Sequence, residues 1–262
     1  MIPKAYIARW RDEVPWSTDD YVEQDLVICR ALVALFSNEF LKDNLAFRGG
    51  TALHKLYLNP APRYSEDIDL VQIKSGPVKP ILQAIGSAID FFEEDRVVKQ
   101  KANNNTILYR FTSESGTRLR LKVEINCREH FNVLGWTSFP FKVENGWFSG
   151  ECEITTYKLE ELLGTKLRAL YQRKKGRDLF DLYYAEQQAK LNWDEILTCY
   201  YKYMDFVVGK APSQKQFLQN MEEKKSDPLF RGDMEGLLRS GVEYDQDKAF
   251  EWVLERIQGR TF

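Results

Sequence analysis

The spacing of apolar residues predicts a mixture of helices and strands before position 156. A helix is expected after the capping side chains at 18–20, because apolar residues then recur at helical spacing from Leu26 to Phe40. Positions 118–125 alternate between polar and apolar residues, which is the pattern of a half-buried strand. In chain order, the other expected elements are strand 45–47, helix 51–58, strand 68–73, helix 80–92 and strands 96–101, 106–112, 139–143 and 151–155.

The pattern changes at Tyr157, after which apolar residues recur only at helical spacing. Proline-containing breaks at 210–212 and 226–228 separate the later segments. The sequence therefore predicts an α+β domain over 1–156 and a helical domain over 157–262. The helices expected in the second domain begin at 157 and continue near 178–190, 194–206, 213–225 and 248–258.

Composition excludes several classes of protein. The 262 residues are 44% hydrophobic and 13% aromatic, too apolar for a disordered chain. No apolar run is long enough to cross a membrane and the first residues do not resemble a signal peptide, so a cytoplasmic protein is expected. With two histidines and four scattered cysteines, free thiols are expected, and any metal should be a hard cation held by carboxylates.

Basic residues are concentrated in two segments, although the whole chain carries 37 Lys and Arg against 39 Asp and Glu. Positions 96–128 hold eight basic and two acidic residues, and positions 158–178 hold seven basic and three acidic ones. Such segments are often solvated helix or strand faces. Two of them near one site would instead favour a polyanionic partner.

Two acidic residues, Asp67 and Asp69, are candidates for binding metal. Residues i and i+2 of a strand point to the same face, so these carboxylates should lie close together and favour Mg²⁺ or Mn²⁺. The pattern alone is weak, because Asp245-Gln246-Asp247 repeats it where an exposed turn is expected. Glu124 lies on the polar side of strand 118–125. It is either a third carboxylate of a two-metal site or an exposed residue paired with a basic neighbour.

The segment Gly49-Gly50-Thr51 lies between an expected strand and an expected helix. Backbone N–H groups at such a helix start can hold phosphate oxygens, and Thr51 adds a hydroxyl donor. A plain tight turn is the alternative. Farther along, Lys166 could be a surface residue of an amphipathic helix, and Asp178 could cap the helix that follows Gly176.

Four segments together resemble the AbiEii family, including the MenT toxins: RGGTAL at 48–53, SEDIDL at 65–70, KLRAL at 166–170 and GRDLFDL at 176–182. Members are nucleotidyltransferase toxins of bacterial toxin–antitoxin systems. The resemblance covers roughly residues 45 to 185 and implies a polymerase-β-like nucleotidyltransferase fold, a mixed sheet with flanking helices.

The resemblance also implies roles for particular residues. Those expected to contact the nucleotide or its phosphates are Gly49, Gly50, Thr51, Ser65, Lys166, Arg48 and Arg63. Those that match metal ligands are Asp67, Asp69 and, by our own alignment of its strand, Glu124. The residues expected to be catalytic are Asp67, Asp69, Lys166 and Asp178, so the helical domain is expected to contribute the last two to the site.

The expected activity is transfer of a nucleoside monophosphate from an NTP to RNA. The resemblance favours the 3′ acceptor end of tRNA, where added nucleotides would block aminoacylation, and it implies Mg²⁺ or Mn²⁺ and an antitoxin encoded nearby. Two alternatives stay open. One is a nucleotidyltransferase that modifies small molecules such as antibiotics, and the other is a nucleotide-binding regulator without catalysis.

Overall fold

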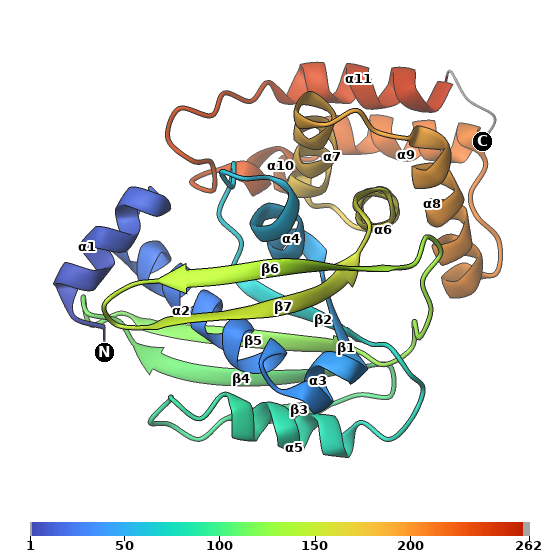
Figure 1. The fold of residues 1–262 in the computed structure, drawn as a ribbon. Helices are drawn as coiled ribbons and strands as arrows, with labels where there is room; N and C mark the ends of the chain where they lie inside the picture. The colour runs from blue at the N-terminus through green and yellow to red at the C-terminus, as the bar shows by residue number, and fades with distance from the viewer. Residues whose placement is uncertain (1, 259–262) are drawn as a thin grey trace. The chain divides into compact units, whose positions relative to one another are not determined.

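The computed structural model describes residues 2–258, which divide into two units. The first unit takes the chain up to Asn132 together with Trp136–Tyr157, and the second takes Val133–Gly135 together with the chain from Lys158 onward. All strands of the described chain belong to the first unit, and the later helices form the second (Figure 1). No helix among the described residues is long and apolar enough to cross a membrane.

The first unit is built on a mixed sheet, seven-stranded over the described residues, in the order β3-β4-β5-β2-β1-β7-β6. Two pairs, β1 with β7 and β2 with β5, are parallel, and the other neighbours are antiparallel. The strands are β1 (Leu45–Arg48), β2 (Asp67–Gln72), β3 (Val97–Gln100), β4 (Asn104–Thr112), β5 (Arg118–Asn126), β6 (Trp136–Glu144) and β7 (Ser149–Tyr157).

Helices pack on this sheet and bury the apolar residues that were predicted to face the core. Helix α2 (Asp19–Phe36) begins at Thr18, whose side chain accepts a hydrogen bond from the Tyr21 N–H, and it contacts β2, β5, β6 and β7. On β5, Leu121 and Val123 are fully buried. The other helices of the unit are α1 (Lys4–Glu13), α3 (Glu39–Asn44), α4 (Gly49–Ala52), η1 (Leu53–Tyr57) and α5 (Lys79–Ala88).

A buried ion pair holds the segment after α4 against α2. The Lys55 Nζ lies 3.0 Å from Asp25 Oδ2 and 3.2 Å from the Cys29 Sγ, and the Trp10 indole donates to the other Asp25 oxygen. Burial alone would lower the pKa of Lys55, but Asp25 and Cys29 outweigh it and raise that pKa. The ammonium therefore stays charged and anchors η1, a single π-helical turn that continues α4.

The second unit is helical and packs α6 against α7 and α8, and α11 against α7 and α9. The fully buried Glu161 ties the segment Val133–Gly135 to this unit, because its carboxylate accepts the N–H groups of Val133 and Leu134 at 2.8 Å and the Tyr203 hydroxyl at 2.7 Å. The helices are α6 (Leu159–Gln172), α7 (Gly176–Gln188), α8 (Trp193–Val208), α9 (Gln214–Lys225), α10 (Pro228–Arg231), η2 (Gly232–Met234) and α11 (Gln246–Gln258).

The α+β class and the mixed sheet predicted from sequence are confirmed. Other details differ. Among them, helix α4 begins at Gly49 rather than at 51, α5 ends at Ala88 rather than at 92, and the N-terminal helix α1 and the short helices α10 and η2 were not predicted. The first difference has a local reason, since Gly49 has a φ of +79° and turns the chain directly from β1 into the helix.

Candidate active site

The pairing of three central strands places the predicted acidic residues on one face of the sheet. In the antiparallel pair β1–β2, Arg48 is opposite Asp69, and in the parallel pair β2–β5, Asp69 is opposite Glu124. Partners in register share a face, so these three side chains form a row across the strands. Asp67 and its partner Lys122 form the next row. We call Asp67, Asp69 and Glu124 the carboxylate face.

Lys122 partly neutralises the carboxylate face. Its Nζ lies 2.8 Å from Asp67 Oδ2 and 3.6 Å from Glu124 Oε2, and all three side chains are about a quarter to a third exposed. The pKa of Asp69 is raised to about 6, first by burial and then by the charges of Asp67 and Glu124. Three carboxylates therefore carry more negative charge than their surroundings balance, which is the condition that favours a bound cation.

Gly49 of the glycine motif lies against one of these carboxylates, that of Asp69. A Cβ on Gly49 would lie 2.3 Å from Asp69 Oδ2, so only glycine leaves room for that carboxylate. Thr51 is buried in α4, where its hydroxyl donates to the Asp67 carbonyl and lies 2.8 Å from the Ser65 hydroxyl. The helix after β1 and the start of β2 are thereby fixed to one another.

The two arginines that were expected to reach phosphate differ in their surroundings. The Arg48 Nη1 donates to Glu129 at 2.7 Å, and the guanidinium lies over the Tyr157 ring next to Asp69 in the sheet. Arg63 is 1% exposed and donates to the Tyr64 carbonyl. Its burial gives no support to a phosphate contact. Glu129 was missed from sequence, because nothing in its local pattern shows that it pairs with Arg48.

The donor set suits a hard divalent cation only in part. The oxygens of Asp67 and Asp69 are the ligands that Mg²⁺ or Mn²⁺ prefers. Yet within residues 2–258 no group of three or more His, Cys, Asp or Glu side chains is placed so that it could hold a metal ion. Glu124 fits both interpretations made from sequence. It lies beside Asp69, as a third carboxylate would, and it also lies near a basic neighbour, Lys122.

The motif residues of the second unit form a buried ion-pair cluster. The Lys166 Nζ lies 3.2 Å from Asp178 Oδ1 and 2.7 Å from Asp181 Oδ2, and the Arg173 guanidinium donates to both Asp178 oxygens. Burial alone would raise the pKa of Asp178, but Lys166 and Arg173 outweigh it and lower that pKa. The capping role considered for Asp178 is wrong, because Lys175 occupies the N-cap of α7 and Asp178 lies within its first turn.

This cluster leads to a stability prediction. Asp178→Asn should destabilise the protein by about 3 kcal/mol at neutral pH, because it leaves a buried lysine with one fewer counter-ion. The pKa of Asp178 is lower in the folded chain than in the unfolded chain, so its contribution is present above about pH 4 and is lost as the pH falls further. Urea unfolding at about pH 7 and pH 3 measures both effects, with a smaller difference between wild type and variant at the acidic pH.

The control is Asp247→Asn, which removes the same charge from the exposed Arg231–Asp247 pair. We expect it to unfold like the wild type, since exposed pairs contribute little. Equal stabilities of Asp178→Asn and Asp247→Asn would contradict a structural role of the cluster.

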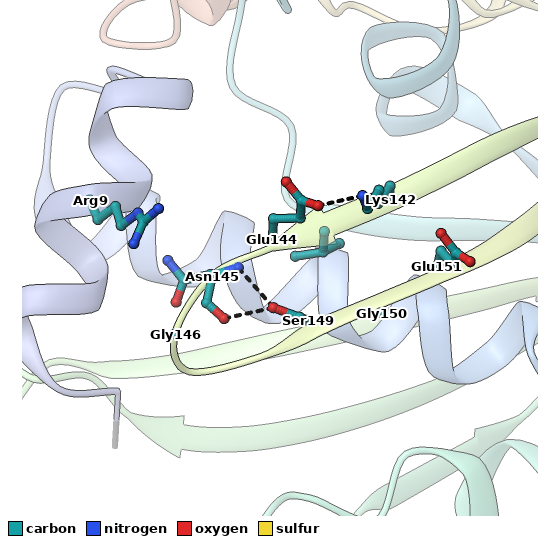
Figure 2. A pocket seen from close by; sticks show the side chains of 9 residues that line it. Arg9, Lys142, Glu144, Asn145, Gly146, Ser149, Gly150 and Glu151 are labelled. Carbon is teal, nitrogen blue, oxygen red and sulfur yellow. Dashed lines mark hydrogen bonds and ion pairs between the residues drawn. The ribbon is translucent and has the colours of Figure 1, made fainter.

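A separate hollow of about 610 Å³ lies at the turn between β6 and β7 (Figure 2). The Asn145 N–H donates to the Ser149 hydroxyl, which donates back to the Asn145 carbonyl, and these bonds hold the turn. Charges of both signs surround it, with Arg9 and Lys142 near Glu144 and Glu151. The sequence-predicted site residues are not in its lining.

The chain is similar to known proteins in sequence and in fold. The family model of the nucleotidyl transferase AbiEii toxin, type IV toxin–antitoxin system, matches residues 30–256. MenT4, a nucleotidyltransferase toxin from Mycobacterium tuberculosis H37Rv, is 16% identical with a TM-score of 0.67, over 99% of this chain and 91% of that chain. JHP933 from Helicobacter pylori is 20% identical with a TM-score of 0.60, over 92% and 91%.

A putative nucleotidyltransferase from H. pylori is also 20% identical, with a TM-score of 0.56 over 92% of this chain and 94% of that chain. No curated protein sequence matches the chain. At these identities the solved structures establish the likeness of the fold, and the predicted nucleotidyltransferase fold is confirmed by it.

Proposed function

Because this chain belongs to the AbiEii family of nucleotidyltransferase toxins of type IV toxin–antitoxin systems, we propose that it transfers a nucleoside monophosphate from an NTP to RNA. The acceptor that we propose is the 3′-terminal hydroxyl of tRNA, and pyrophosphate is released. One observation carries the proposal: the carboxylate face lies against a glycine, Gly49, at the start of a helix. The backbone N–H groups at this helix start, which we propose bind phosphate, thus adjoin the acidic side chains.

Within the first unit, the role that we propose for each residue follows from its position. We propose that Gly49, Gly50 and Thr51 line the nucleotide phosphates together with Ser65, and that Arg48, held by Glu129, adds positive charge beside Asp69. Asp67 and Asp69 would hold Mg²⁺ or Mn²⁺. When bound, such an ion supplies charge neutralisation at the phosphates and lowers the pKa of an attacking hydroxyl.

For the second unit, the proposal rests on the family motifs alone. Lys166 and Asp178 match the lysine and the acidic residue of those motifs, and we retain them as catalytic candidates. Their ion pair is consistent with this role, because Asp178 and Asp181 fix the direction of the Lys166 ammonium. A cationic group held in place costs little reorganisation when it meets a triphosphate.

Charge supports RNA as the acceptor. Some of the basic residues at 96–128 are already paired, Arg118 with Glu94 and Lys122 with Asp67. Arg110 and Arg120 are exposed and opposite one another on β4 and β5. Adjacent exposed arginines suit a phosphate backbone. The partners that we propose are an NTP, tRNA and the cognate antitoxin that a toxin–antitoxin system implies.

The acceptor can be tested by offering the purified protein each of the four α-labelled NTPs with Mg²⁺ and either total tRNA or small hydroxylated acceptors such as aminoglycosides. We expect label in tRNA, and we expect chelation with EDTA to abolish it because phosphoryl transfer depends on charge neutralisation. Label in the small acceptors alone would identify a small-molecule nucleotidyltransferase. NTP binding without transfer to any acceptor would identify a regulator.

A further inference from the structure

Lys122 occupies a position on the carboxylate face that the proposed reaction does not explain. Its ammonium lies between Asp67 and Glu124, at 2.8 Å and 3.6 Å from their oxygens. It was not among the site residues expected from sequence, where it counted only as one of the basic residues of 96–128 and as a polar position of an alternating strand. Its side chain is 26% exposed, so it is not a freely solvated surface lysine.

The sheet itself sets this position. Lys122 and Glu124 are two residues apart on β5 and therefore point to the same face, while Asp67 is the register partner of Lys122 on β2. The three side chains thus start from two adjacent, hydrogen-bonded strands of one unit. A lysine on these strands stays near both carboxylates, because its position does not depend on a flexible loop.

Position and charge together give Lys122 the properties of a bound cation. Two divalent ions at a site of this kind need carboxylates that bridge them. Here the ammonium already bridges Asp67 and Glu124, and among the described residues Asp69 is the one member of the carboxylate face that forms no ion pair with it. The ammonium carries one positive charge and would repel a divalent ion at the same place.

We propose that the Lys122 ammonium takes the place that a second divalent cation would have in a two-metal site, so that the carboxylate face binds a single divalent ion, at Asp67 and Asp69. This inference rests on the proposed nucleotidyltransferase function for its biological meaning. Lys122 is then a fixed counter-ion of Glu124, and the residue at position 122 decides how many metal ions the site holds.

The test is the binding of Mn²⁺ alone to the purified full chain, followed by electron paramagnetic resonance of the free ion. Wild type should bind one Mn²⁺ at this site. Lys122→Met should bind a second ion, or bind Mn²⁺ at least roughly tenfold more tightly, because it removes a positive charge a few ångströms from the ligands. Adding Asp67→Asn to Lys122→Met should abolish the gain.

Two control variants separate this effect from a general change of charge or fold. Arg120→Met removes one positive charge from the same face of β5, two residues before Lys122. This variant should bind Mn²⁺ like the wild type. Lys122→Arg keeps the charge and should also resemble the wild type. Thermal unfolding identifies any variant that is not folded. If Lys122→Met is among them, the binding of one or of two Mn²⁺ ions by the wild type remains the test.

The possible outcomes differ for the two proposals. The role of Lys122 would be overturned if the wild type bound two Mn²⁺ ions. It would also be overturned if wild type and Lys122→Met bound Mn²⁺ with equal stoichiometry and with affinities within twofold, even if nucleotide transfer is intact. The expected change in Mn²⁺ binding, in a protein that transfers no nucleotide to any acceptor, would support the role of Lys122 and refute the proposed function.

Discussion

Replacing Asp67 with asparagine is expected to lower nucleotide transfer by roughly 10³-fold or more, because phosphoryl transfer depends on charge placed at the phosphates. Asparagine keeps the size of the side chain and removes the charge that contacts Lys122 and adjoins Asp69. The Asp67 side chain is about one third exposed, so the fold should be retained. Labelled-NTP transfer onto tRNA measures the loss, and urea unfolding checks the fold.

The matched control is Asp247→Asn, because Asp245-Gln246-Asp247 has the same sequence pattern in an exposed segment. It should transfer nucleotide like the wild type. A folded Asp67→Asn protein with activity within a few fold of the wild type would show that the carboxylate face is not the site of the reaction. Retained toxicity of an inactive Asp67→Asn protein in cells would instead indicate a binding role without catalysis.

The second large effect is expected at Gly49. An alanine there would place its Cβ 2.3 Å from Asp69 Oδ2, and the φ of +79° is unfavourable for any residue with a Cβ. The backbone strain should cost roughly 1–2 kcal/mol of stability. Displacement of the Asp69 carboxylate should cost about 10²-fold or more in transfer, since small shifts of catalytic groups are expensive. Urea unfolding and steady-state transfer rates measure the two effects separately.

Gly116→Ala separates backbone strain from the contact with Asp69. Gly116 also has a positive φ, +87°, but a Cβ on it would meet nothing within 4 Å. This variant should therefore lose a similar amount of stability and keep its activity. If Gly49→Ala and Gly116→Ala have equal transfer rates, the close approach of Gly49 to Asp69 has no catalytic meaning.

Local sequence pattern predicted the elements of the fold well, because burial follows the periodicity of apolar residues. The alternation at 118–125 placed Leu121 and Val123 in the core and Glu124 on the opposite side, as observed. Local pattern does not predict strand order. The pairing of β5 with β2, which brings Glu124 beside Asp69, joins segments more than fifty residues apart. Glu124 could be proposed from sequence as a third carboxylate, but its position beside Asp69 in the sheet could not be predicted.

The residues missed from sequence act through partners distant in the chain. Lys122 was one of several basic residues in its segment, and only its register with Asp67 distinguishes it. Glu129 pairs with Arg48 across 81 positions. The motif residues Lys166 and Asp178 were recognised by resemblance, whereas their pairing with each other and with Asp181 and Arg173 depends on how α6 and α7 pack.

The most direct test of the proposed reaction follows the α-phosphate of an NTP into tRNA. Wild type is expected to attach α-labelled nucleotide to intact tRNA, to leave γ-label in pyrophosphate, and to attach none to tRNA whose 3′-terminal diol has been oxidised with periodate. Equal labelling of intact and oxidised tRNA, or incorporation of the γ-label, would contradict nucleotide transfer to the 3′ end.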